Sequence, residues 1–262
     1  MGAYAAERPL AIWVAGEPVA EAARLRGSFA DMIRSAVGEA WPGAWSAADI
    51  TTNSFVSPEP AQLAGVIVTG SPARIADQAP WMVRVQQALR ELVAERVPVL
   101  GICFGHQLLG MALGGSCGPN PLGREIGSVR LRSYSRSSSR SLDDPLFSAA
   151  PQSFLVSMTH LDAVLELPPG AAVLGATDLD RHAAVRFGEH AWGVQFHPEM
   201  GAEIIGAYID ARRDALRSEG LDPQRLLADC ADTPEATELL RGFARRLRRA
   251  RTPRAALSAH RI

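Results

Sequence analysis

The stretch Val97-Pro-Val-Leu-Gly101-Ile-Cys103-Phe-Gly105-His-Gln-Leu-Leu-Gly-Met-Ala-Leu-Gly-Gly115 decides the fold. It begins with an apolar run typical of a buried strand, and it ends with helix-forming residues that stop at a pair of glycines. Between them stands Gly101-x-Cys103-x-Gly105, the pattern of a nucleophile elbow with cysteine in place of serine. The sequence therefore predicts a sharp strand-to-helix turn with Cys103 at its tip.

Cys103 at this position has the properties of a nucleophile. Glycine two residues to either side removes side chains that would block the neighbouring backbone, so the thiol stands clear of the sheet. The positive end of the following helix stabilises a thiolate and lowers the pKa of the cysteine. The competing interpretation is an inert buried cysteine, because free cysteines are commonly buried. The two glycines favour the nucleophile.

Strand-like and helix-like segments alternate along the first half of the chain. Apolar runs at residues 10–16 and 63–69 are typical of buried strands, and apolar residues recur at helical spacing within 18–38 and over 81–96. Strands that alternate with helices form a parallel sheet with helices on both faces. We therefore expect an α/β fold with an open, mostly parallel central sheet.

After Gly115 the sequence is richer in short strand-like runs, which predict antiparallel additions to the sheet. The runs are residues 126–132, 153–157, 172–176, 183–187 and 191–196. A Ser/Arg tract at 133–141 is interpreted as a solvated hairpin loop, with a contact for an anionic partner as the alternative. Helical spacing returns from residue 202, and a further helix is predicted over 234–249. The arginine-rich tail is either solvated or a docking segment.

Composition excludes several classes of function. The 262 residues include 27 basic residues, all of them arginine, and 28 acidic ones, for a net charge of -1. Without lysine there is no Schiff-base or P-loop lysine, and a charge near zero gives no general attraction to nucleic acid or to anionic membranes. No secretory signal, transmembrane span, metal cluster or disulfide pattern is recognisable, since Cys103, Cys117 and Cys230 are odd in number and scattered. We expect a cytoplasmic protein that needs no metal or organic cofactor.

A later motif, Gly193-Val-Gln-Phe-His197-Pro-Glu199, offers a proton shuttle for the thiol. Residues i and i+2 of an extended segment point to the same side, so the Glu199 carboxylate is expected to hold the His197 ring and fix its tautomer. The sequence thus predicts a triad of Cys103, His197 and Glu199. Other histidines are expected in a helix, in turns or in the tail: His106, His182, His190 and His260.

Acyl transfer also needs hydrogen-bond donors for the developing oxyanion. One is the backbone N–H of Phe104, which follows the nucleophile at the start of the helix. A second is expected from Gly70, where the strand at residues 63–69 ends in a glycine that lets a bare backbone approach a substrate.

These motifs, with Val68-Thr-Gly70-Ser-Pro72 as the third, resemble those of the class I (triad) glutamine amidotransferases. The resemblance is closest to stand-alone proteins similar to the amidotransferase domain of GMP synthase, and it covers residues from about 10 to 203. It implies a flavodoxin-like sheet, an amidotransferase domain at residues 1–203 and a C-terminal helical extension at 204–262 packed on it. It also implies Cys103 as nucleophile, His197 as general base, Glu199 as the orienting carboxylate and Gly70 with Phe104 as oxyanion donors.

The resemblance further implies a glutamine pocket. Gln107 stands at the position that contacts glutamine in the family. The segment at residues 157–162 matches the Ser-His-Gly-Asp sequence that lines the pocket, with Leu161 in place of the usual glycine. Substrate-binding roles are therefore expected for Ser157, Met158, Thr159 and His160.

The reaction expected from the resemblance is hydrolysis of the γ-amide of glutamine through a γ-glutamyl thioester. The chain ends about 60 residues after the triad and has no Ser-Gly-Gly-x-Asp-Ser loop, so the expected ammonia acceptor is a separate synthase subunit. The alternative is a γ-glutamyl peptidase or hydrolase with the same triad. A second copy of the chain is an open option as a partner; nucleic acid and membrane are not expected.

Two further classes of function fit the sequence less well than these enzymes. Chaperones and deglycases with a cysteine elbow carry histidine directly after the cysteine, where this sequence has Phe104. A non-catalytic subunit that has kept the fold is disfavoured by the intact Cys103, His197 and Glu199.

Overall fold

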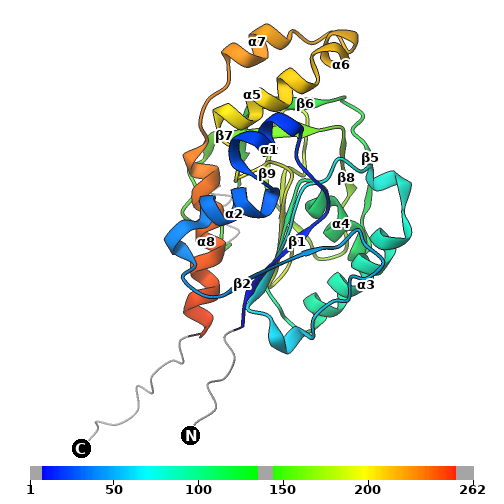
Figure 1. The fold of residues 1–262 in the computed structure, drawn as a ribbon, viewed down its shortest axis with the longest axis vertical. Coiled ribbons are helices and arrows are strands. Elements are labelled where there is room, and N and C mark those ends of the chain that lie inside the picture. Colours follow the sequence, from blue (N-terminus) through cyan, green and yellow to red (C-terminus); the bar gives the residue numbers. More distant parts are fainter. Residues whose placement is uncertain (1–7, 135–143, 252–262) are drawn as a thin grey trace, which may run out of the picture.

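The computed structural model describes residues 8–134 and 144–251 (Figure 1). Most of the Ser/Arg tract, with Arg136 and Arg140, lies outside the described residues, and so does the end of the tail with His260. Within the described part the predicted α/β fold is confirmed. The arginine-rich segment after Arg241 is helical as far as Arg251.

One large mixed sheet organises the molecule. Its strand order is β2-β1-β3-β4-β11-β10-β9-β6-β7. The first five of these strands run parallel to one another, and each later strand is antiparallel to its neighbour. The parallel strands are β1 (Leu10–Val14), β2 (Trp45–Asp49), β3 (Gly65–Val68), β4 (Val99–Ile102) and β11 (Ala191–Val194). The antiparallel additions are β6 (Glu125–Ser133), β7 (Ser153–His160), β9 (Ala172–Ala176) and β10 (Ala184–Gly188).

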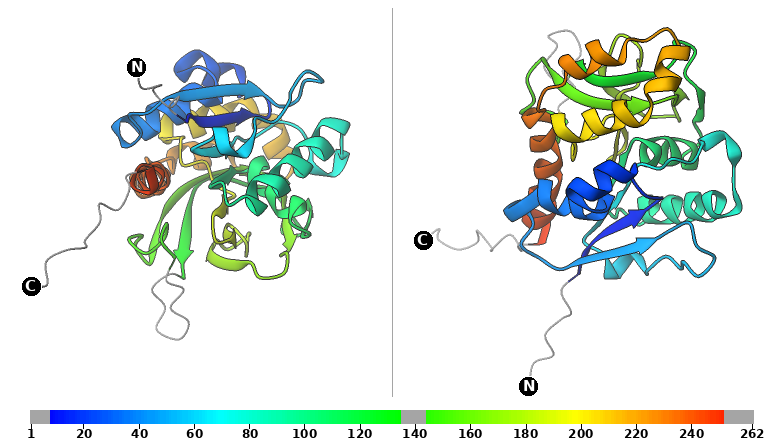
Figure 2. Two further views of the ribbon diagram at one scale, coloured as in Figure 1. Left: turned by 90° about the horizontal axis from the view of Figure 1, so that it is seen from below. Right: turned by 45° about the horizontal axis from the view of Figure 1, so that its top comes forward.

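Helices cover both faces of the parallel strands (Figure 2). Successive residues of β1 alternate between the faces: Leu10 and Ile12 belong to one core, Ala11 and Trp13 to the other. The first core lies under α2 (Phe29–Val37) and α8 (Pro234–Arg251), and the second under α3 (Pro80–Ala94) and α4 (Phe104–Ala112). The near-continuous apolar sequence of β1, β3, β4 and β11 fits their burial on both faces.

The C-terminal helices add to this architecture in two ways. The buried side of α8, including Leu240 and Phe243, packs in the same core as strands β7 and β9. The helix α5 (Ala202–Ala211) packs against β6 and β7, with α6 (Arg213–Ser218) and α7 (Pro223–Ala228) beside it. None of the helices in residues 8–134 and 144–251 is long and apolar enough to cross a membrane.

The structure differs from the sequence-based expectation at several elements. The helix expected within 18–38 is two helices, α1 (Ala20–Arg26) and α2, because Gly27 has φ 77° and Ser28 begins a new capping box with Asp31. The strand expected from Val97 begins at Val99. Three short strands were not predicted: β2, β5 (Ser116–Pro119) and β8 (Asp162–Glu166), of which the last two form a separate two-stranded sheet.

The carboxyl ends of the parallel strands meet at one edge of the sheet. Gly70 follows β3, Cys103 follows β4 and His197 follows β11. Ligands of open α/β sheets bind at this edge. The fold thus brings residues that are far apart in the sequence to one place.

Candidate active site

Cys103 lies at the turn between β4 and α4 in a strained backbone conformation. Its φ is 51° and its ψ is -104°, and its N–H donates to the carbonyl of Val194 at 2.8 Å. A residue other than glycine at positive φ is uncommon and costs on the order of 1–3 kcal/mol. Such strained residues are found most often at functional sites. The turn has the geometry of a nucleophile elbow.

The two glycines of the elbow are required by close backbone contacts. A Cβ on Gly105 would lie 2.3 Å from the carbonyl oxygen of Val68, and a Cβ on Gly101 would lie 2.4 Å from the carbonyl oxygen of Gly105. The N–H of Gly105 donates to Thr69 at 3.1 Å, which ties the start of α4 to the end of β3. The helix therefore begins directly against the neighbouring strand.

His197 and Glu199 are joined by a hydrogen bond of 2.7 Å between Nδ1 and Oε1. The backbone between them is not the extended segment expected from the sequence. The N–H of Met200 donates to the carbonyl of His197 at 3.2 Å, so Pro198 and Glu199 form a turn after β11. Both side chains are nearly inaccessible to solvent.

Gly70 borders both Cys103 and His197. A Cβ built on it would lie 2.7 Å from Cε1 of His197 and 3.7 Å from Cβ of Cys103. The Nε2 atom of His197, which points away from Glu199, would be 3.6 Å away. The ring is thus oriented with one nitrogen on Glu199 and the other beside Cys103 and Gly70.

Substitution of Gly70 by alanine is expected to reduce kcat/KM by roughly 100-fold, because the added methyl displaces the His197 ring from the nucleophile. Hydrolysis of glutamine and of a γ-glutamyl peptide would be measured together with thermal unfolding. The control is Gly242→Ala in α8, where the new Cβ meets Leu146 at an ordinary 3.5 Å. Full activity of Gly70→Ala would show that the ring is not held in this position.

The electrostatics of the pair favour a thiolate beside an imidazolium. Burial by itself would raise the pKa of Cys103, but the charge and hydrogen bond of His197 outweigh it and lower that pKa. Burial opposes the charge on His197 too, yet the Glu199 carboxylate and the Cys103 thiolate raise the pKa of His197 to about 10. Each charge therefore stabilises the other: the imidazolium lowers the pKa of the Cys103 thiol, and the thiolate raises the pKa of His197.

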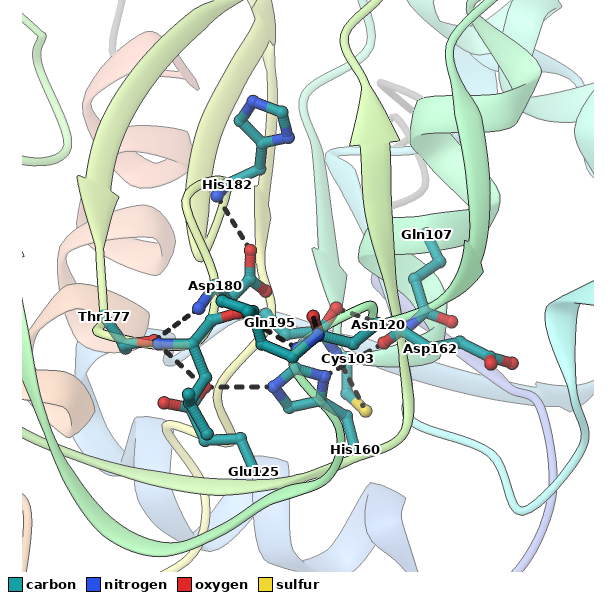
Figure 3. A network of polar contacts seen from close by, with 12 residues as sticks. Cys103, Gln107, Asn120, Glu125, His160, Asp162, Thr177, Asp180, His182 and Gln195 are labelled. Atoms are coloured by element: carbon teal, nitrogen blue, oxygen red, sulfur yellow. Dashed lines mark hydrogen bonds and ion pairs between the residues drawn. The ribbon is translucent and has the colours of Figure 1, made fainter.

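A buried polar network runs from Cys103 to β6 (Figure 3). The amide of Gln195 donates to the Cys103 sulfur at 3.5 Å and accepts from Gln107 at 3.1 Å. Gln107 also donates to the carbonyl of Asp162 at 2.6 Å. The side-chain amide of Gln107 is therefore engaged within the protein and is linked to Cys103 through Gln195.

His160 stands at the centre of this network. One ring nitrogen lies 3.0 Å from the carbonyl of Asp162 and the other 3.2 Å from the Glu125 carboxylate, which also accepts from Thr177. Burial lowers the pKa of His160, but hydrogen bonding to Glu125 and the charge of Asp180 raise it overall. His160 thus adds positive potential near Cys103, whose pKa it helps to lower.

The residues expected to line the glutamine pocket occupy different surroundings. The Ser157 hydroxyl donates to the carbonyl of Met200 at 2.9 Å, and the side chain of Met158 is part of the hydrophobic core. The hydroxyl of Thr159 is buried and has no hydrogen-bond partner among the described residues. Thr159 is thus the member of the segment with an unused polar group.

Leu161, which replaces the glycine of the family, causes no backbone strain. In the described ranges the non-glycine residues with positive φ are Gln78, Arg96 and Cys103. Asp162, the next residue, is held by Arg74 through hydrogen bonds of 2.8 and 2.5 Å. Leucine is therefore compatible with the turn between β7 and β8.

Several residues of the site were missed by sequence reasoning. Gln195 precedes His197 by two positions, so its presence beside the nucleophile had a signal in the motif. Glu125, Thr177 and Arg74 come from other segments and are brought in only by the fold. No group of three or more His, Cys, Asp or Glu residues in residues 8–134 and 144–251 is arranged to hold a metal ion.

Known proteins resemble this chain in sequence and in fold. The glutamine-hydrolysing GMP synthase of Aeropyrum pernix is 36% identical over 153 residues, which are 56% of this chain and 27% of that protein. Gamma-glutamyl peptidase 3 of Arabidopsis thaliana is 31% identical over 148 residues, 56% of this chain and 58% of that protein. The chain thus spans about a quarter of the GMP synthase and somewhat more than half of the peptidase.

Among solved structures, a glutamine amidotransferase from Methylobacillus flagellatus matches 97% of this chain and all of its own, with a TM-score of 0.72 and 20% identity. A glutamine amidotransferase from Thermotoga maritima matches 91% of this chain and 97% of its own, with a TM-score of 0.67 and 22% identity. These structures share the fold. The family model for class I glutamine amidotransferases matches residues 45–209, more than half of the sequence, and the chain therefore belongs to the class I glutamine amidotransferase family.

Proposed function

We propose that this chain hydrolyses the γ-amide bond of glutamine through a thioester on Cys103. The observation that carries the proposal is the thiol at the strained turn beside an imidazole whose other nitrogen is 2.7 Å from Glu199. An activated nucleophile, a proton shuttle and an orienting carboxylate are the parts that such a reaction requires.

The reaction consists of two acyl transfers. The Cys103 thiolate adds to the γ-carbon of the substrate, and the oxyanion that forms lies near the N–H groups of Gly70 and Phe104. The carbon–nitrogen bond then breaks, and the leaving nitrogen takes the proton from Nε2 of His197. Water, deprotonated by the now neutral His197, attacks the thioester. Glutamate leaves, Cys103 is released as the thiolate, and His197 keeps the proton that it took from water.

In the amidotransferase reaction the leaving group is ammonia, and we propose that a separate synthase subunit uses it. This part of the proposal is supported by the similarity to GMP synthases, of which the chain spans about a quarter. Binding to such a subunit is expected to raise the rate of glutamine hydrolysis.

A second candidate is hydrolysis of γ-glutamyl peptides, in which the leaving group is an amino acid or peptide. It is supported by the similarity to gamma-glutamyl peptidases 3 and 5 of Arabidopsis thaliana, at 31% and 33% identity. The same three side chains would catalyse both reactions. The two candidates therefore differ only in the leaving group, which is ammonia in one and an amino acid or peptide in the other.

The two candidates are separated by measuring glutamate release from glutamine and from γ-glutamyl dipeptides, with Cys103→Ala as the blank. Rapid turnover of the peptides would make the protein a γ-glutamyl hydrolase. Slow turnover of glutamine alone would be the result for an ammonia donor without its synthase. Release that persists in the Cys103→Ala blank would contradict both.

A further inference from the structure

Arg212 lies close to the proton shuttle but has no role in the mechanism above. It follows α5, and its guanidinium carbon is 4.8 Å from the centre of the Tyr208 ring. That ring in turn lies 6.5 Å from the ring of His197. The Tyr208 ring is therefore a neighbour of both the guanidinium and the imidazole.

This guanidinium is partly buried and has no acidic partner among the described residues. Its neighbour Arg213 pairs with Asp210, and the fork of Arg124 is taken by Glu219. Within residues 8–134 and 144–251, the guanidinium of Arg212 makes a single hydrogen bond, a long one of 3.4 Å to the carbonyl of Tyr208. Since an arginine presents five N–H donors, most of them remain available to a ligand.

Leaving such a cation unpaired is unfavourable. Burial lowers the pKa of Arg212, and the nearby positive charge of Arg124 acts in the same direction, whereas Tyr208 and the Cys103 thiolate raise it. A partly buried charge without a counter-ion carries a desolvation cost that a bound anion would relieve. A carboxylate is the anion whose planar shape matches the guanidinium fork.

A second polar group without a partner lies on the same side of the sheet. Thr159 and Ser157 project from the same face of β7, and the Ser157 hydroxyl bonds to Met200 just before α5. Thr159 pairs across the ladder with Ile126, which packs in one cluster with Tyr208. Its buried hydroxyl is therefore an unused hydrogen-bonding group under α5, the helix that Arg212 follows.

We propose that Arg212 binds a carboxylate carried by the leaving amine of a γ-glutamyl peptide. The inference rests on the second candidate function above. The leaving nitrogen receives its proton from His197, so a substituent on that nitrogen lies on the His197 side. In the proposed arrangement this substituent extends past the Tyr208 ring to Arg212. Ammonia has no substituent to place there, whereas an amino acid or dipeptide ends in a carboxylate.

The test compares γ-glutamyl-alanyl-glycine with its C-terminal amide, which has the same shape without the charge. The dipeptide leaving group is chosen because one further residue extends the reach by about 3.5 Å, past the Tyr208 ring. We expect the wild-type protein to favour the acid over the amide in kcat/KM by roughly 10- to 100-fold, mainly through KM. Arg212→Met is expected to bring this ratio close to one.

The matched control is Arg213→Met, the adjacent arginine, which pairs with Asp210. It is expected to keep the wild-type ratio. Thermal unfolding of Arg212→Met is expected to be unchanged or raised, because an unpaired charge has been removed. A wild-type ratio near one, or an equal loss for acid and amide in Arg212→Met, would overturn the proposal.

A binding measurement separates this inference from the proposed function. Calorimetry with Cys103→Ala, which cannot turn over, is expected to show tighter binding of the acid than of the amide, and the difference is expected to vanish in Cys103→Ala/Arg212→Met. Discrimination in binding without hydrolysis by the wild-type protein would refute the proposed function but keep the Arg212 site. Hydrolysis without a preference for the acid over the amide would refute the Arg212 site alone. If neither peptide bound, the Arg212 site would also be refuted.

Discussion

Cys103→Ala is expected to lower kcat/KM for glutamine and γ-glutamyl peptides by on the order of 10⁴-fold or more. The reason is that no thioester can form, and the oxyanion donors at Gly70 and Phe104 alone supply only the residual rate enhancement. Steady-state assays of glutamate release would measure the loss. The thermal midpoint is expected to change by only a few degrees, since the substitution removes one atom at a turn that the Gly101 and Gly105 contacts maintain.

The control for that substitution is Cys230→Ala. Burial raises the pKa of Cys230, and its thiol is bonded to the carbonyl of Leu226 at 3.3 Å, outside the site. The variant is expected to retain wild-type activity. Substantial turnover by Cys103→Ala, or a comparable loss in Cys230→Ala, would contradict the assignment of the nucleophile.

Glu199→Gln is expected to lower kcat/KM by roughly 10²- to 10⁴-fold and to move the alkaline limb of the pH profile downward. In the wild-type protein the pKa of His197 is raised to about 10, so the imidazolium persists below that pH and is lost above it. Without the carboxylate, only the Cys103 thiolate opposes the effect of burial, so the pKa of His197 falls. The imidazolium is then lost at lower pH, and with it the proton for the leaving amine.

The pH dependence of kcat/KM for both proteins measures this shift. Glu203→Gln is the matched control, because Glu203 is an exposed carboxylate nearby in the chain that pairs with Arg26 at 2.8 Å. Its profile is expected to match that of the wild type. A Glu199→Gln profile with an unmoved alkaline limb would show that the carboxylate does not set the charge of His197.

The fold was predictable where local chemistry and tertiary packing agree. The strand, turn and helix around Cys103 were predictable because Gly101 and Gly105 mark places where two backbone segments approach too closely for a larger residue. The sequence also contains a signal for the break between α1 and α2, namely Gly27 followed by the capping residues Ser28 and Asp31. The break was not predicted because the helical spacing of apolar residues continues across it. The strand β2 gives a weak pattern, because its residues are half-buried or exposed at the edge of the sheet.

The site was predictable in part for the same reason. Cys103, His197 and Glu199 stand in local motifs, so their proposed roles could be inferred from the residues next to them in the sequence. The His197–Glu199 contact was expected from an extended strand, whereas a turn at Pro198 produces it. Glu125, Arg74 and Arg212 lie in segments without a motif, and their nearness to the site depends on strand order and on the packing of α5, which no local pattern reveals.

The most direct test of the account is to trap the acyl-enzyme. The protein would be mixed with a γ-glutamyl substrate, quenched in acid within the first turnover, digested and analysed by mass spectrometry. We predict a γ-glutamyl group on the peptide that contains Cys103, labile to alkali as a thioester is, and more abundant in Glu199→Gln if deacylation is slowed. Steady turnover with no adduct on Cys103, or with the adduct on Cys117 or Cys230, would contradict the account.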